Sequence, residues 1–111
     1  MFKLVKKTSI WWPVTVQVPQ DGGKTQPRRL QAEFKLLSQP QIDELLQESP
    51  HDVEFLCEVV TDWKDVADED GQPLVCSPEQ RLELFEIGYV RAGFFEAFWK
   101  ANSGRAAALK N

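Results

Sequence analysis

The sequence predicts an α+β fold in which a small antiparallel sheet, built on a β-hairpin, precedes about four α-helices. Two observations lead to this prediction. Apolar residues recur at every second position in residues 10–18 and 30–36, as in strands, and at every third or fourth position afterwards, as in helices. Because 111 residues can enclose one core, we expect a single domain (1–104) with a β part (1–37), a helical part (38–104) and a flexible tail (105–111).

Two alternating runs predict the strands of the hairpin. Apolar and polar residues alternate in the ranges 10–18 and 30–36, which is typical of half-buried strands. The segment Pro19–Arg28 between them contains Gly and Pro and predicts a hairpin loop of about ten residues. Phe2 and Leu4 are expected to form a short additional strand, which would give the sheet three strands.

Helix signals divide the rest of the chain. Ser38 and Ser77 each precede a proline in the first helical turn, and a Gln three positions after each Ser can complete a capping box. Gly88 predicts a break between the last two helices, since glycine inside a helix costs about 1 kcal/mol relative to alanine. The expected helices are one after Ser38, one from Ser49 to Val60, one from Pro78 to Ile87 and one from Tyr89 to Asn102.

Charge is unevenly distributed, although the net charge is only −4. Residues 1–37 carry seven Lys/Arg against two Asp/Glu, residues 38–80 one against twelve, and residues 81–111 five against three. Such blocks predict electrostatic steering between copies of the protein or toward a basic partner. The alternative is a helical region with a solvated acidic face.

Two segments resemble ligand-binding motifs, and both fail on spacing. Gly23–Thr25 ends like a phosphate-binding loop, but Val18 occupies the position of the required first glycine. The acidic run before Gly71 resembles a calcium loop, but Ser77 stands where the bidentate Glu is needed. We therefore expect no cofactor and no ATP dependence.

The remaining reactive side chains do not predict catalysis. His51 is the single histidine, and with Cys57 and Cys76 it does not make the four-ligand set of structural zinc. We expect no enzyme activity, and two free thiols in a cytoplasmic protein. The basic start of the chain lacks the apolar run of a secretory signal, in keeping with this location.

The final helix is the most apolar element. It carries two neighbouring stripes, one of Val90, Phe94, Ala97, Phe98 and Ala101, the other of Tyr89, Ala92, Phe95 and Trp99. A helix that is apolar over most of its circumference is either buried or covered by a partner. The candidate partner-binding residues are Tyr89, Phe94, Phe95, Phe98 and Trp99, and packing of the same residues in the core alone is the alternative.

The segment between residues 59 and 80 has the most distinctive order of residues. Trp63 and Val66 lie in an acidic stretch, Asp70–Pro73 predicts a turn, and Ser77 opens the next helix. In so acidic a loop the two apolar residues are the expected anchors. We expect Trp63 to belong to the core.

Several of these features in sequence resemble the small tail assembly chaperones of long-tailed phages. The resemblance is carried by the Pro19–Gly23 turn, the Trp63–Gly71 stretch and the Tyr89–Ala92 start of the last helix. The chain departs from the family pattern at Gly88, where proline is common, and at Gly93, where alanine or an aliphatic residue is usual. These departures concern the course of the last two helices.

The resemblance implies a non-enzymatic assembly factor in the cytoplasm of the bacterial host. Such proteins coat the tape-measure protein and help to recruit tail-tube protein, and self-association is expected. A competing interpretation is a nucleic-acid adaptor that uses the basic N-terminal hairpin with Trp11 and Trp12. A third is a protein-interaction domain with another client.

Overall fold

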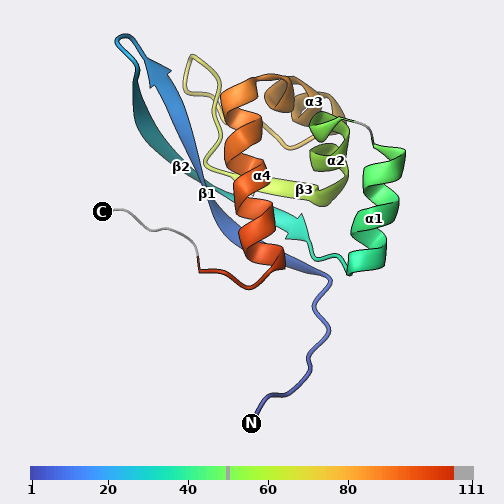
Figure 1. The fold of residues 1–111 in the computed structure, drawn as a ribbon. Coiled ribbons are helices and arrows are strands. Elements are labelled where there is room, and N and C mark those ends of the chain that lie inside the picture. The colour runs from blue at the N-terminus through green and yellow to red at the C-terminus, as the bar shows by residue number, and fades with distance from the viewer. Residues whose placement is uncertain (50, 107–111) are drawn as a thin grey trace.

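The fold is the α+β arrangement that the sequence predicts, with a three-stranded antiparallel sheet and four helices among the described residues (Figure 1). The computed structural model describes residues 1–49 and 51–106. In chain order the elements are β1 (Ser9–Gln20), β2 (Lys24–Lys35), α1 (Gln39–Glu48), α2 (Asp52–Val59), β3 (Val60–Lys64), α3 (Pro78–Glu86) and α4 (Gly88–Asn102). Of the predicted tail (105–111), Arg105 and Ala106 are exposed, and the rest lies outside the described residues.

Strands β1 and β2 pair over their whole length and form a long twisted hairpin (Figure 1). The turn is Asp21–Gly23, in which Gly22 and Gly23 have φ angles of 87° and 81°. Glycine adopts this left-handed region without the steric cost that other residues meet. The loop expected over Pro19–Arg28 is therefore wrong, because both strands continue to either side of a three-residue turn.

The third strand comes from the middle of the chain. β3 follows α2 directly and pairs antiparallel to β2, with Trp63 opposite Ala32. Val60 and Trp63 are buried, and a run rich in β-branched and aromatic residues suits a strand. The expected division into a β part and a helical part is corrected accordingly, because residues 60–64 belong to the sheet.

The N-terminal segment does not join the sheet. Residues 1–7 have no regular structure and are exposed, so the strand expected at Phe2 and Leu4 is wrong. The backbone N–H of Leu36 donates to the carbonyl oxygen of Thr8 at 2.9 Å, which marks the end of the paired region. Residues 1–7, which precede Thr8, extend away from the body of the protein (Figure 1).

The predicted caps set the starts of two helices. The hydroxyl of Ser38 accepts from the N–H of Gln41, and the Gln41 side chain accepts from the N–H of Ser38 at 2.8 Å. This reciprocal pair is a capping box. At α3 the Ser77 hydroxyl accepts from the N–H of Gln80 at 3.1 Å, which confirms the predicted cap but not the return bond from the Gln80 side chain.

Helices α3 and α4 are separated by one extended residue, Ile87, with φ −80° and ψ 115°. The break falls beside Gly88, as predicted. The Arg91 guanidinium donates to the carbonyl oxygen of Phe85 at 2.9 Å and so satisfies an acceptor in the last turn of α3. This bond holds the angle between the two helices.

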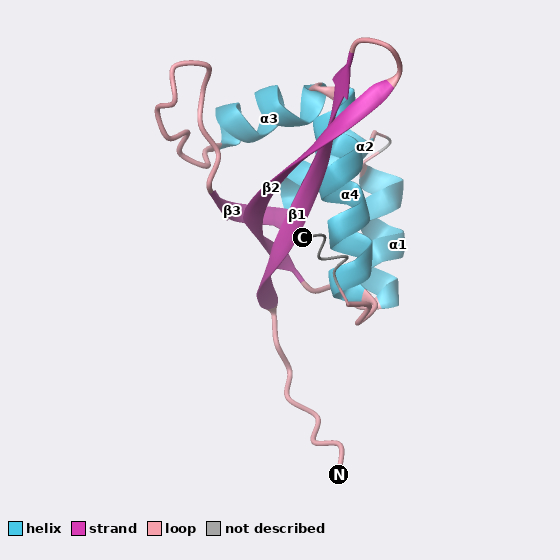
Figure 2. Ribbon diagram, turned by 90° about the vertical axis from the view of Figure 1, so that its left-hand side faces the viewer, coloured by secondary structure: helices cyan, strands magenta, loops and turns pink. Residues whose placement is uncertain are grey.

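Helix α4 lies along β1, and the helices gather on one face of the sheet (Figure 2). Phe94 and Phe98 pack edge-on against Phe34 of β2, with ring centroids 6.4 Å and 6.0 Å apart. Gly93 lets α4 approach β1 closely, since a Cβ atom there would lie 2.6 Å from the carbonyl oxygen of Thr15. Gly93 is thus the point at which α4 comes closest to the backbone of β1.

Candidate partner-binding surface

The five predicted partner-binding residues all lie on helix α4, and they fall into two groups by burial. Phe94 and Phe98 are 0% exposed, so their assignment to a partner surface is corrected: they are core residues. The reason is their place in the stripe that faces the sheet, all five members of which are buried. Tyr89, Phe95 and Trp99 keep accessible surface and remain candidates.

The second stripe of α4 turns toward α2. The ring centroids of Phe95 and Trp99 lie 5.4 Å and 6.1 Å from the ring centroid of Phe55. The centroids of Phe95 and Trp99 are 6.0 Å apart. We call these three residues the aromatic ladder. Phe55 is 0% exposed and packs on Phe98 at 5.3 Å, so the half-buried rings of Phe95 and Trp99 stand on a rigid base. Tyr89, 41% exposed, lies at the start of α4 outside the ladder.

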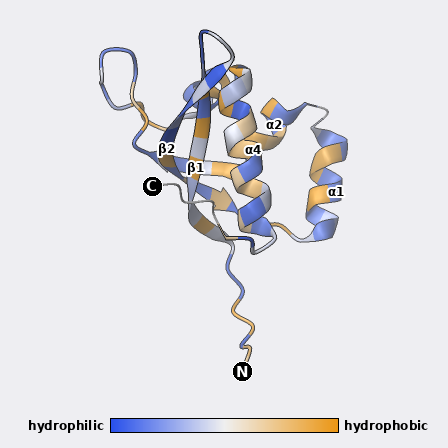
Figure 3. Ribbon diagram, turned by 60° about the vertical axis from the view of Figure 1, so that its left-hand side comes forward, coloured by the Kyte–Doolittle hydropathy of each residue, from blue (hydrophilic) through white to orange (hydrophobic). Residues whose placement is uncertain are grey.

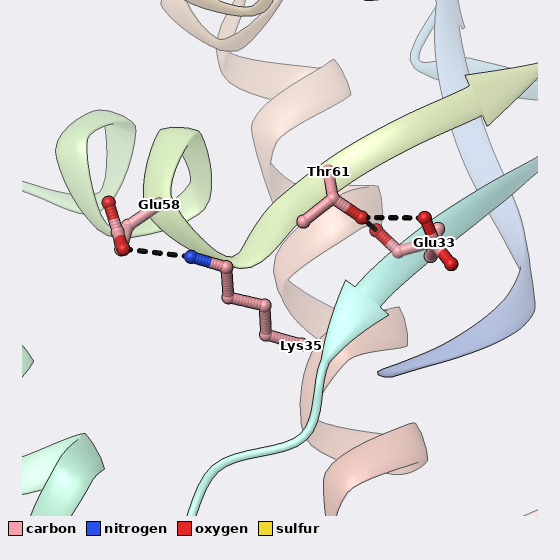
Figure 4. Close-up of polar contacts among 4 residues, drawn as sticks. All are labelled: Glu33, Lys35, Glu58 and Thr61. Atoms are coloured by element: carbon pink, nitrogen blue, oxygen red, sulfur yellow. Dashed lines mark hydrogen bonds and ion pairs between the residues drawn. The ribbon is translucent and has the colours of Figure 1, made fainter. Parts of the chain in front are cut away.

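Polar contacts tie the base of the ladder to the sheet (Figure 4). The ammonium of Lys35 in β2 lies 2.9 Å from the carboxylate of Glu58 in α2, the helix that carries Phe55. The Thr61 hydroxyl of β3 donates to the Glu33 carboxylate of β2 at 2.9 Å. Since exposed ion pairs contribute roughly 0–1 kcal/mol, the Lys35–Glu58 pair orients α2 more than it stabilises it, and the Thr61–Glu33 bond joins β3 to β2.

Trp63 is a core residue, as predicted, and anchors the loop that follows it. Its side chain is 6% exposed, with ring centroids 6.4 Å from Phe85 and 6.5 Å from Phe94. The indole N–H donates to the carbonyl oxygen of Leu74 at 2.8 Å. The indole therefore connects the core to the far side of the loop.

The loop between β3 and α3, residues 65–77, is called the acidic loop below. The Asp68 carboxylate accepts from the backbone N–H groups of Asp70 and Gln72, both at 2.9 Å, so this acid shapes the loop. The side chains of Glu69 and Asp70 are exposed. Their charges face solvent and are free to act on another molecule.

The basic residues that suggested a nucleic-acid adaptor do not form one surface. Those in residues 24–29 lie at the tip of the hairpin, and those in residues 1–7 lie at the other end of the molecule (Figure 1). Trp11 is half-buried and carries the Lys64 ammonium 4.3 Å from its ring centroid. Trp12 is half-buried as well, so the arrangement lacks the free stacking platform that single strands need.

A crevice of about 280 Å³ lies between the hairpin and α4. Trp12, Arg29 and Lys100 contribute to its lining, and the Lys100 ammonium is paired with Glu96 at 2.9 Å. Its walls offer cations, a carboxylate, an indole and the side chain of Thr15. Among residues 1–49 and 51–106, no group of three or more His, Cys, Asp or Glu side chains could hold a metal ion.

The two thiols are free and half-buried. Burial raises the pKa of Cys57 and of Cys76 above the ordinary value for a thiol. Arg81 opposes this effect, since its guanidinium lies 3.7 Å from the Cys76 sulfur. The net result keeps both thiols protonated at neutral pH.

Alkylation of Cys57 and Cys76 near neutral pH is therefore expected to be slower in the folded protein than in urea, because the thiolate is the reacting form. Mass spectrometry over time measures both rates. A raised folded-state pKa gives stability that is present below the unfolded pKa and is lost as pH rises through the folded pKa. The free energy of unfolding should thus fall in alkaline solution, and equal alkylation rates in both states would contradict the assignment.

Some exposed apolar side chains were not predicted as partner-binding residues. Phe2, Leu4 and Val5 are 85%, 74% and 74% exposed, and Val75 in the acidic loop is 78% exposed. The alternation of Phe2 and Leu4 with Lys3 predicts a strand. The same pattern, in a segment without a neighbouring strand, is the signal that could have identified it as a surface.

Comparison with known proteins adds no relative: no family model, no curated protein and no solved structure matches the chain. In the part of the chain that the structure describes, no helix has the length and apolar character needed to cross a membrane. Function is therefore inferred from the surfaces described above and from the resemblance in sequence.

Proposed function

We propose that the protein is a non-enzymatic tail assembly chaperone of a phage or prophage. It binds the tape-measure protein, aids assembly of the tail tube without ATP, and associates with itself in the cytoplasm of the bacterial host. The observation that carries the proposal is the aromatic ladder, in which the partly buried rings of Phe95 and Trp99 stand on the buried ring of Phe55. Aromatic residues of this kind supply most of the binding energy in protein interfaces.

The chemistry suits a client with exposed apolar segments. The rings of Phe95 and Trp99 can cover apolar side chains of the client, and Phe55 beneath them limits the entropy lost on binding. The exposed carboxylates of the acidic loop give the complex a charged surface that resists aggregation. Neither step needs a cofactor or a chemical reaction.

Replacing Phe95 and Trp99 together by glutamine tests the proposal. Loss of two central aromatic side chains should weaken binding of the tape-measure protein about thirtyfold or more. The measurement is recovery of co-expressed tape-measure protein with the tagged chaperone, followed by titration with the purified client segment. Circular dichroism shows whether the variant is folded.

The control is Leu82→Gln, which changes an apolar side chain on α3 that is more exposed (48%) than the rings of Phe95 and Trp99. This variant should bind the client as the parent protein does. Equal recovery of the tape-measure protein with the parent and the double variant would reject the ladder as the binding surface. Binding of single-stranded nucleic acid with a steep salt dependence would instead favour the adaptor interpretation.

A further inference from the structure

The segment of residues 1–7, called the N-terminal arm, is an exposed strip of apolar and basic residues. Phe2, Leu4 and Val5 are 74–85% exposed, and Lys3 and Lys6 lie between and beside them. The alternation of hydrophobic and hydrophilic residues is visible along the arm (Figure 3). So much exposed apolar surface in a short segment marks an interaction site.

The opposite end of the molecule carries the complementary character. The acidic loop lies in the half of the protein opposite the arm, the half that also holds the tip of the hairpin (Figures 1 and 2). It presents the exposed carboxylates of Glu69 and Asp70 together with Val75, which is 78% exposed. The arm thus offers cations and apolar side chains, and the loop offers anions and an apolar side chain.

We propose that the N-terminal arm of one molecule binds the acidic loop of a second copy of the same chain, head to tail. In the structure the arm points away from the acidic loop of its own molecule, so a second copy is the partner proposed for each surface (Figures 1 and 2). Lysines of the arm then pair with Glu69 and Asp70, while Phe2, Leu4 and Val75 are removed from water. Charge complementarity fixes the register of the contact and speeds encounter.

We expect the arm to contact the acidic loop through side chains and not to pair as an added strand with β3, the edge strand beside the loop. The backbone N–H of Trp63 in the edge strand β3 already donates to the Asp62 carboxylate at 2.8 Å. That N–H is therefore not free to pair with an added strand. A charged side chain on an edge strand is a common barrier to strand addition.

The tip of the hairpin is the other basic site that an acidic loop could meet. Residues 24–29 are exposed and basic, but they bring no large apolar side chain with them. The arm provides both components of the contact, which is the reason to prefer it. The tip supplies the control for the experiment.

A contact between two different surfaces is heterologous, so each molecule keeps a free arm and a free loop after binding one neighbour. Copies would add one after another into a ring or an open chain. This inference rests on the self-association proposed above and not on the client. The experiment therefore uses the purified chain alone, and its failure would leave binding of the tape-measure protein untouched.

The test exchanges charge between the two surfaces. Variant A carries Lys3→Glu and Lys6→Glu, and variant B carries Glu69→Lys and Asp70→Lys, all at exposed positions. Sedimentation velocity over a concentration series is measured at ~0.1 M and ~1 M salt, where the screening length falls from about 10 Å to about 3 Å. The parent should form oligomers that weaken in the higher salt.

Each variant alone should associate about tenfold more weakly or not at all, because arm and loop then have the same sign. Mixing A with B should restore assembly, since each arm again meets a loop of opposite charge. The control Lys24→Glu with Arg28→Glu, of equal charge change at the hairpin tip, should behave as the parent. A monomeric parent, unaffected variants, an inactive mixture, or loss of assembly in the control would each overturn the proposal.

Discussion

Replacement of Trp63 by alanine is expected to lower the free energy of unfolding by about 3–5 kcal/mol, the usual range for removing a large buried aromatic side chain. The indole is 6% exposed and contacts the rings of Phe85 and Phe94, so its loss leaves a cavity among α3, α4 and the sheet. Urea denaturation followed by far-ultraviolet circular dichroism measures the change. A loss below ~1 kcal/mol would show that Trp63 does not pack the core.

The variant Trp63→Phe separates packing from anchoring. Phenylalanine retains most of the buried ring but cannot donate to the carbonyl oxygen of Leu74, so we expect a loss nearer 1 kcal/mol. Limited proteolysis of the acidic loop provides the second measurement. Cleavage should be faster in Trp63→Phe than in the parent, because the far side of the loop loses its bond to the core.

The elements that local chemistry determines were predicted correctly. Ser38 and Ser77 accept from the N–H groups that an N-terminal cap should satisfy. Gly88 lies at the break between the last two helices. Each of these signals acts within four residues of its target, so the sequence alone carries it.

Strand β3 could not be predicted, because pairing with a distant strand decides its conformation. Residues 53–60 have helical periodicity, and no Gly or Pro separates α2 from β3. The chain leaves the helix at Val60, where burial beside β2 favours the extended form. A tertiary contact of this kind leaves no local signal in the sequence.

The length of the hairpin was underestimated for a related reason. Pro27 lacks an N–H and predicts a loop when it is considered alone. β3 pairs only with residues 31–34 of β2, so farther along the hairpin β2 has a free edge where no N–H is needed. Pro27 therefore fits within the strand opposite Gln17.

The two apolar stripes of α4 were predicted, but the side of the helix that faces the sheet was not. Periodicity identified both stripes, and it could not tell which one faces the sheet. The small residues of the first stripe and Gly93 decide the matter, since they let the helix lie close against β1. Phe94 and Phe98 are then carried into the core, and Phe95 and Trp99 are left at the surface.

Gly93→Val is accordingly expected to destabilise the protein by about 3 kcal/mol or more, at the upper end of the range for overpacking. A Cβ atom at Gly93 would lie 2.6 Å from the Thr15 oxygen and 3.2 Å from the Cα of Val16. Both are backbone atoms, so no side chain can rotate away and α4 has to move off β1. The shift would also displace Phe94 from Phe34.

Two alanine variants distinguish the effect of the Gly93–β1 contact on stability from the effect of helix propensity. Gly88→Ala should be neutral or stabilising by up to about 1 kcal/mol, because the nearest atom to a Cβ there is the end of the Arg91 side chain at 3.8 Å. Gly93→Ala gains at least as much helix propensity, because Gly93 lies in the interior of α4, but its Cβ meets the backbone of β1, so it should be less stable than Gly88→Ala. Equal unfolding free energies for the two would mean that α4 does not depend on glycine to reach the sheet, and the burial of Phe94 and Phe98 would then need another cause.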